Sequence, residues 1–295
     1  MTANRSEVAD GPRPRLATQL PWWLSPALGV DASPRRRRRL ALRTGALLLA
    51  VGVLALAMLA LWEEVNTYAG RSPETGRKVL TAICLSEGLV ATMGSAALGS
   101  AAALTPVRGA LTDAMLTPIP RWQVAIVAAI AAVLPADAAT VLIAAALVAV
   151  SAVTGWANPL AVAQAHLVLL ATVSAIGAAS LAVRLSGRHR ALGIAAAWAC
   201  VVLLIGGPIL VGPAIAAAPN PHPFILPVLA ANPPVAIATC LDLDLLRTDR
   251  IYQLTPIPAY QFGYPSPLVT LGVYSIAFVM LLALCCRALN RAEGG

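Results

Sequence analysis

The sequence predicts an all-α integral membrane protein with six transmembrane helices, and three observations lead to this fold class. Of its 295 residues, 59% are hydrophobic and 12% are charged, whereas a soluble domain usually has about 25% charged residues. Six apolar segments approach or exceed the length of about 20 residues that is needed to cross a hydrocarbon core of about 30 Å. Five consecutive arginines at 35–39 precede the first of these segments, as basic clusters do at the cytoplasmic end of a span.

Residues 1–39 are predicted to form a cytoplasmic tail with a short interfacial segment. The tail begins with polar residues, and the apolar stretch at 20–28 is too short to cross a bilayer. Its paired Trp22 and Trp23 suit the headgroup boundary. The arginines before the first apolar segment resemble a twin-arginine export signal, but that segment exceeds the roughly 7–15 apolar residues of a signal peptide. We therefore expect an uncleaved span.

Residues 40–295 are predicted to form one transmembrane domain. The third apolar segment is long and contains Pro135 and Asp137, so it is expected either to be one kinked or tilted span or to divide into two short ones. The residues from Trp156 to Pro159 predict a turn after it. The six expected spans are 43–62, 80–104, 123–152, 160–183, 191–216 and 267–286.

The distribution of basic residues predicts the orientation in the plasma (inner) membrane. With both termini cytoplasmic, 16 of the 21 Lys and Arg residues lie inside, which the positive-inside rule favours. The segment 217–266 then lies outside. It is apolar yet contains nine prolines, and each proline removes a backbone donor. We expect short interfacial or re-entrant helices there instead of a regular span.

Two acids, Glu87 and Asp137, fall within predicted spans. An intramembrane acid suggests a functional site because charge is costly there, but both could also lie near helix ends or hydrogen-bond across the bundle. No Lys or Arg in a span is available as a partner for Glu87. His166 is the one histidine within a span, whereas haem ligation by a bundle would use facing pairs, so no cofactor is expected.

The chain contains no motif for catalysis, nucleotide binding or metal binding. No P-loop is present, and Lys78 is its one lysine. G-x-S-x-G and H-E-x-x-H motifs are absent too, and the five cysteines form no CxxC pair or metal spacing. The basic run is explained by topology, so no nucleic-acid partner is expected. A membrane enzyme using either intramembrane acid is the least favoured class.

The connection between the second and third spans is the most informative stretch, with the sequence LTPVRGALTDAMLTPIPR at 104–121. It resembles the coupling loop of the permease subunits of ABC exporters of the second type. The residues in register with that loop are Arg108, Gly109, Leu111, Leu116, Thr117, Pro118 and Ile119. The resemblance extends to the basic turn at 184–191 and to the outer Asn-Pro segment at 231–237. The overall plan over about 20–290 is similar as well.

The resemblance implies a permease subunit that works with a separate ATP-binding subunit, as a homodimer or heterodimer of permeases among membrane lipids. The loop would dock on the ATPase. Leu111, Met115 and Leu116 share one helical face between two prolines, with Arg108 and Arg121 at its rim. The substrate is unspecified, although the few polar groups in the spans suit a lipid-like molecule.

Two departures from the family pattern favour a second interpretation. The family has an acid before the arginine, whereas this chain has Thr105 or Pro106 near that place. The family often has Gly-Lys after the loop, whereas this chain has Ala128-Ala129. A chain that keeps the permease fold without coupling to an ATPase would be a non-transporting scaffold or assembly subunit of a larger complex.

Overall fold

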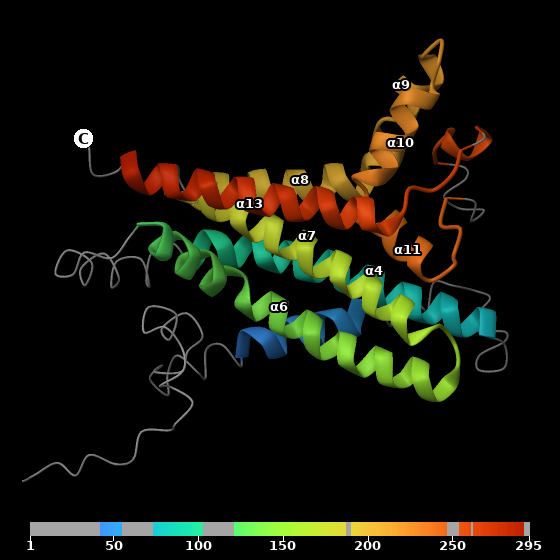
Figure 1. Cartoon of the computed structure of the whole chain (residues 1–295), viewed down its shortest axis with the longest axis horizontal. Helices are drawn as coiled ribbons and strands as arrows, with labels where there is room; N and C mark the ends of the chain where they lie inside the picture. Colours follow the sequence, from blue (N-terminus) through green and yellow to red (C-terminus); the bar gives the residue numbers. More distant parts are fainter. Residues whose placement is uncertain are drawn as a thin grey trace, which may run out of the picture.

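The computed structural model of the chain describes residues 42–54, 73–102, 121–186, 190–246, 254–260 and 262–291. Within these ranges the regular elements are helices, as the composition predicts, and no strand occurs among them. Figure 1 shows the long helices lying side by side along the longest axis of the molecule.

Five helical segments are long and apolar enough to cross a membrane, and they lie where five of the six spans are predicted. The remaining expected span, the first in chain order at 43–62, is described only as the helix Leu42–Leu54. Residues 55–72 lie outside the described residues. The five segments are built from α4 (Pro73–Ala102), α6 (Arg121–Thr154), α7 (Pro159–Leu185), α8 (Arg190–Leu210) continuing into α9 (Gly212–Ala217), and α13 (Pro267–Arg291).

The third predicted span is one continuous helix, so the alternative of two short segments is wrong. Helix α6 has 34 residues and contains Pro135 in its interior. It is followed by the predicted turn, which starts at Gly155 in the left-handed region (φ +67°). Asn158 then caps α7, because its side chain accepts a hydrogen bond from the Leu160 amide and Pro159 occupies the first turn.

Helix α7 is the centre of the bundle. In the apolar stretch of α7, 67% of the residues are buried, whereas 17% are buried in the corresponding stretches of α8 and α13. Helix α7 packs against α4, α6, α8, α11 and α13. Small residues allow the close approach of α4 and α7: a Cβ added to Gly99 would lie 2.5 Å from the backbone oxygen of Gly177. Glycine contacts of this kind are a common packing device between helices in lipid.

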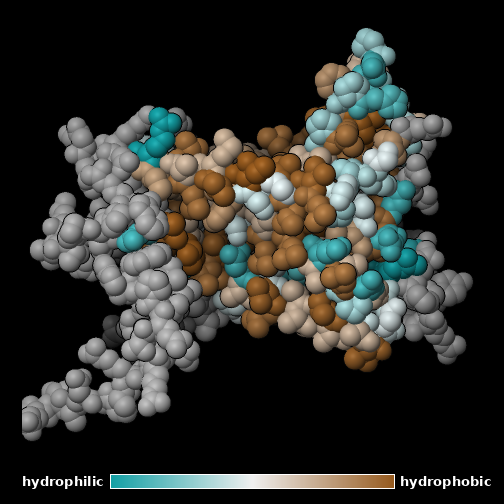
Figure 2. Space-filling model, viewed as in Figure 1, coloured by the Kyte–Doolittle hydropathy of each residue, from teal (hydrophilic) through white to brown (hydrophobic). Residues whose placement is uncertain are grey.

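The outward faces of the helices are apolar, as expected for contact with lipid chains. Large exposed side chains such as Leu142, Leu203 and Met280 lie on three different helices. Figure 2 shows hydrophobic residues predominating across the middle of the drawn face, between its two ends. A soluble protein rarely exposes so much contiguous apolar surface, so the structure is compatible with a multi-pass membrane protein.

The proline-rich segment after α8 forms short helices, as predicted from its sequence. After α9 come α10 (His222–Ala230) and α11 (Pro233–Cys240), which are bent by 79° at their junction, and later the 3₁₀ turn η2 (Ile257–Ala259). In Figure 1, α9 and α10 project away from one end of the bundle, while α11 returns to it. A separate apolar cluster, which includes Ile225 and Ile257, joins these elements.

Candidate functional site

The predicted coupling loop lies outside the described residues. This applies to Arg108, Gly109, Leu111, Met115, Leu116, Thr117 and Pro118, which fall within 103–120. Arg121 is the first residue of α6, although its side chain is not described. The structure does place the two ends of the loop, at Ala102 on α4 and at Arg121 on α6.

The intramembrane acid Glu87 bonds to a histidine across the bundle. Its Oε2 lies 3.1 Å from Nε2 of His166, and the two side chains are 1% and 2% exposed. Glu87 lies on α4 and His166 on α7, 79 positions later in the chain. The sequence offers no Lys or Arg within a span as a partner for Glu87, and the partner is the one histidine within a predicted span. The shared intramembrane location of the acid and the histidine was the available signal.

Two further groups complete the surroundings of the Glu87–His166 pair. The Nδ1 of His166 lies 2.7 Å from the backbone oxygen of Val162, one turn earlier on α7. From α6, the Thr140 hydroxyl lies close enough to Glu87 to interact with its carboxyl. Among the described residues, Glu87 Oε1 and Thr140 Oγ1 are buried atoms without a hydrogen-bond partner of regular geometry. The pair therefore joins α4 and α7, with α6 alongside.

The second intramembrane acid, Asp137, occupies a different position. It is half-buried on α6 and accepts a weak hydrogen bond from Ser174 Oγ, whose distances to Oδ2 and Oδ1 are 3.4 and 3.5 Å. Each acid thus bonds across the bundle to α7, the structural role considered from the sequence. The described hydrogen bonds do not join the two acids to each other, and each acid bonds to its own partner on α7.

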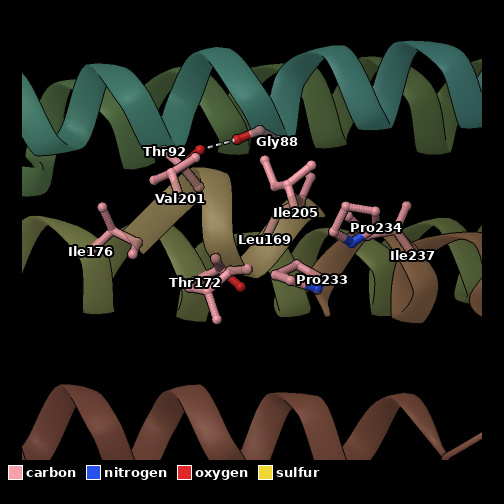
Figure 3. A pocket seen from close by; sticks show the side chains of 11 residues that line it. Gly88, Thr92, Leu169, Thr172, Ile176, Val201, Ile205, Pro233, Pro234 and Ile237 are labelled. Carbon is pink, nitrogen blue, oxygen red and sulfur yellow. Dashed lines mark hydrogen bonds between the residues drawn. The ribbon is translucent and has the colours of Figure 1, made fainter. Parts of the chain in front are cut away.

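An apolar cavity lies next to the Glu87–His166 pair, between α4, α7, α8 and α11. It is a small cavity, with enclosed space for about one water molecule. Thr92 donates to the Gly88 oxygen at 2.6 Å, which Figure 3 marks with a dashed line, and Thr172 donates to the Val168 oxygen at 2.8 Å. Because both hydroxyls bond within their own helices, the cavity is left with an aliphatic lining. Sequence reasoning did not predict it, since four separate helices form it.

The bend between α10 and α11 is stabilised by Asn232. The ring of Pro208 leaves no N–H for the Leu204 oxygen one turn earlier in α8. The Asn232 amide donates to that oxygen at 2.6 Å and to the Ile205 oxygen at 3.1 Å. Its own oxygen accepts from the Val235 amide at 3.0 Å, which caps α11. One side chain therefore compensates for a proline and begins a helix.

Other side chains donate to three more backbone oxygens at or near this bend. From α13, Thr270 donates to the Ala230 oxygen at 2.8 Å and Tyr274 donates to the Ala231 oxygen at 2.7 Å. Thr255 donates to the Pro208 oxygen at 2.7 Å. These oxygens of the irregular backbone are thus bonded to protein groups, as backbone groups must be wherever water is excluded.

Within the described residues no group of three or more His, Cys, Asp or Glu could hold a metal ion. The five cysteines are free thiols, and three of them are buried. No family model, no curated protein and no solved structure matches this chain. Its function is therefore inferred from its own residues and geometry.

Proposed function

We propose that this chain is the transmembrane permease subunit of an ABC-type exporter, working as a dimer of permeases with a separate ATPase subunit. The observation that carries the proposal is the loop at 104–121, whose Arg108-Gly109 and Thr117-Pro118 resemble the coupling loop of such permeases. The helices that the loop connects support it. The loop connects α4 to α6, and both helices pack directly against the central α7.

This connection gives a mechanical route from an ATPase to the bundle. A force applied to the loop acts on α4 at Ala102 and on α6 at Arg121. Helix α7 holds both, through Ser95 donating to the Val173 oxygen at 2.8 Å and through the Asp137–Ser174 contact. Hydrolysis in the partner would move these helices relative to α7 and shift the bundle between inward-open and outward-open states.

The outer segment supports the same assignment. The Asn-Pro motif at 232–233 has a defined role there, since Asn232 caps α11 and Pro233 begins it. Side chains, including Thr270 and Tyr274, satisfy the backbone oxygens at the 79° bend between α10 and α11. Irregular backbone is tolerated at membrane depth when protein groups satisfy it. We therefore assign α10 and α11 as a re-entrant pair in the outer half of the bilayer.

The geometry favours a lipid-like substrate over a polar one. The cavity has an aliphatic lining, because the hydroxyls of Thr92 and Thr172 bond within their own helices. A polar solute would need free hydrogen-bonding groups along its path, whereas an alkyl chain needs only apolar surface.

The coupling assignment is tested by the double variant Leu111→Ala, Leu116→Ala, using copurification of an ATPase at equal membrane expression. Truncating well-packed anchors typically costs about 2 kcal/mol or more, roughly a thirtyfold loss of affinity, so the ATPase should be lost. Arg121→Ala should act mildly and depend on salt, because rim charges chiefly affect association. The matched control is Leu268→Ala, Leu284→Ala, which truncates two exposed leucines of α13 and should retain the ATPase.

The second candidate is a scaffold or assembly subunit that keeps the permease fold. It is favoured by Thr105 or Pro106 near the place of the family's acid and by Ala128-Ala129 in place of Gly-Lys. If the wild type binds no ATPase and copurifies with another large complex, the scaffold function replaces the exporter function. Retention of the ATPase by the Leu111→Ala, Leu116→Ala variant would instead refute the docking site.

A further inference from the structure

We propose that Glu87 and His166 form an intramembrane binding site for one exchangeable proton. The ligand is the proton itself, shared between Oε2 of α4 and Nε2 of α7 across 3.1 Å. The site belongs to this chain alone, so the proposal stands whether or not an ATPase docks on the coupling loop.

The hydrogen bond of His166 to Val162 fixes the tautomer of the ring. A backbone carbonyl can only accept, so the contact of 2.7 Å requires a hydrogen on Nδ1. The other ring nitrogen, Nε2, then has two options. It accepts a hydrogen bond from a protonated Glu87, or it donates one as part of an imidazolium to the Glu87 carboxylate.

Both options contain the same number of protons. In the first option a neutral imidazole lies beside a carboxylic acid, and in the second an imidazolium lies beside a carboxylate. Each option holds one proton between Nε2 and Oε2, and each is neutral overall. Removing that proton would leave a net negative charge on side chains that are 1% and 2% exposed, and adding another would leave a net positive charge. An unpaired charge in such surroundings is strongly disfavoured, so the one-proton state is preferred over a wide pH range.

The groups around the pair leave this proton count unchanged. The Cys84 thiol, one turn earlier on α4, interacts with Glu87, and the Cys240 thiol of α11 interacts with Cys84. Asp137, one turn before Thr140 on α6, bonds to Ser174 instead. Among the described residues, no Lys or Arg forms an ion pair with Glu87, whose one such contact is with His166.

The shared proton links the packing of α4 against α7 to pH. If the two helices separate, Glu87 and His166 lose each other as partners, and each then exchanges protons according to its own surroundings. Above about pH 6.5, the ordinary range of a histidine, a solvated Glu–His pair holds no shared proton. Separation there releases one proton, so rising pH favours the separated state.

The proposal is tested by unfolding the purified chain in detergent between about pH 5 and pH 9, with wild type and Glu87→Gln compared. In wild type, the native pair holds one proton and the unfolded pair loses it above about pH 6.5. The unfolding constant should therefore rise up to tenfold per pH unit above that value, in addition to the contribution of other groups. Between about pH 4.3 and 6.5 both states hold one proton, so the pair contributes no pH dependence.

In Glu87→Gln the sign should reverse. The glutamine amide donates to Nε2, so native His166 stays neutral, while the unfolded histidine gains a proton below about pH 6.5. Stability should then fall as the pH is lowered, and should be flat above that value. Asp137→Asn is the matched control, because it removes the other intramembrane acid and should keep the wild-type dependence of the pair. If wild type and Glu87→Gln give parallel pH profiles, the proposal is overturned.

A second measurement covers the case in which Glu87→Gln does not fold. The sequence has three histidines, so ¹⁵N-histidine labelling gives three ring systems, and His166→Gln assigns one by its absence. The proposal requires His166 to keep a protonated Nδ1 without change from about pH 5.5 to 7.5, the range in which a free imidazole titrates. An Nδ1 without a hydrogen, or titration of the His166 ring within that pH range, would overturn the proposal.

Discussion

Replacing Asn232 by alanine removes three hydrogen bonds at once from the junction of α8, α10 and α11. The amide group donates to the Leu204 and Ile205 oxygens, and the side-chain oxygen accepts from the Val235 amide. Asn232 is 1% exposed, so water cannot readily replace these bonds. The Leu204 oxygen depends most on the amide, since Pro208 provides no N–H one turn later in the helix.

The magnitude follows from these separate losses. Loss of the helix cap of α11 costs typically about 1 kcal/mol. A buried oxygen left without a donor costs about 1–3 kcal/mol, although hydrogen bonds between transmembrane helices average about 0.6 kcal/mol in measured cases. Asn232→Ala should therefore reduce the free energy of unfolding by about 2–3 kcal/mol, with most of the effect at α11 and the end of α8. Asn232→Ser should cost less, because serine can cap α11 while lacking the amide donor.

The assay is unfolding of the purified protein in detergent at one pH, for Asn232→Ala in two backgrounds. Pro208→Ala restores an N–H that can donate to the Leu204 oxygen within α8. In that background Asn232→Ala should lose about 1 kcal/mol less than in wild type, because the oxygen is already satisfied. An equal cost in both backgrounds would refute the reasoning that Asn232 compensates for the proline.

Two further predictions rest on the packing of the helices, and a third rests on the distribution of basic residues. Gly99→Ala should destabilise the bundle, since its new Cβ would lie 2.5 Å from a backbone oxygen of α7. The control Gly272→Ala should be neutral or stabilising, because no atom lies within 4 Å of its new Cβ. Equal melting temperatures of the two variants would contradict the close approach. Asp137→Asn should change stability by less than about 1 kcal/mol in the same unfolding assay, because the contact that it alters is long and half-exposed; a larger loss would show a role beyond the Ser174 contact. In sealed cells with native cysteines replaced, an impermeant thiol reagent should label a cysteine at Thr248 and not at Ser186; the reverse result would invert the topology.

The sequence alone determined the features that depend on local patterns. Apolar length and composition indicated a multi-pass membrane protein and located five long apolar helices. The Asn158-Pro159 pair marked the start of α7, since capping and the fixed φ of proline act within one turn. The prolines after α8 correctly indicated short helices, because each removes a backbone donor wherever it lies.

Only the tertiary structure decided which distant groups meet. Glu87 and His166 pair across 79 positions because α4 and α7 lie side by side in a particular register, and nothing in either local sequence specifies that register. The same holds for Asn232 and the Leu204 oxygen, 28 positions apart, and for the cavity formed by four helices. In lipid, the helices are sorted by small-residue contacts and polar bonds between them, so the partner of a buried polar group is decided by packing and not by the pattern around it.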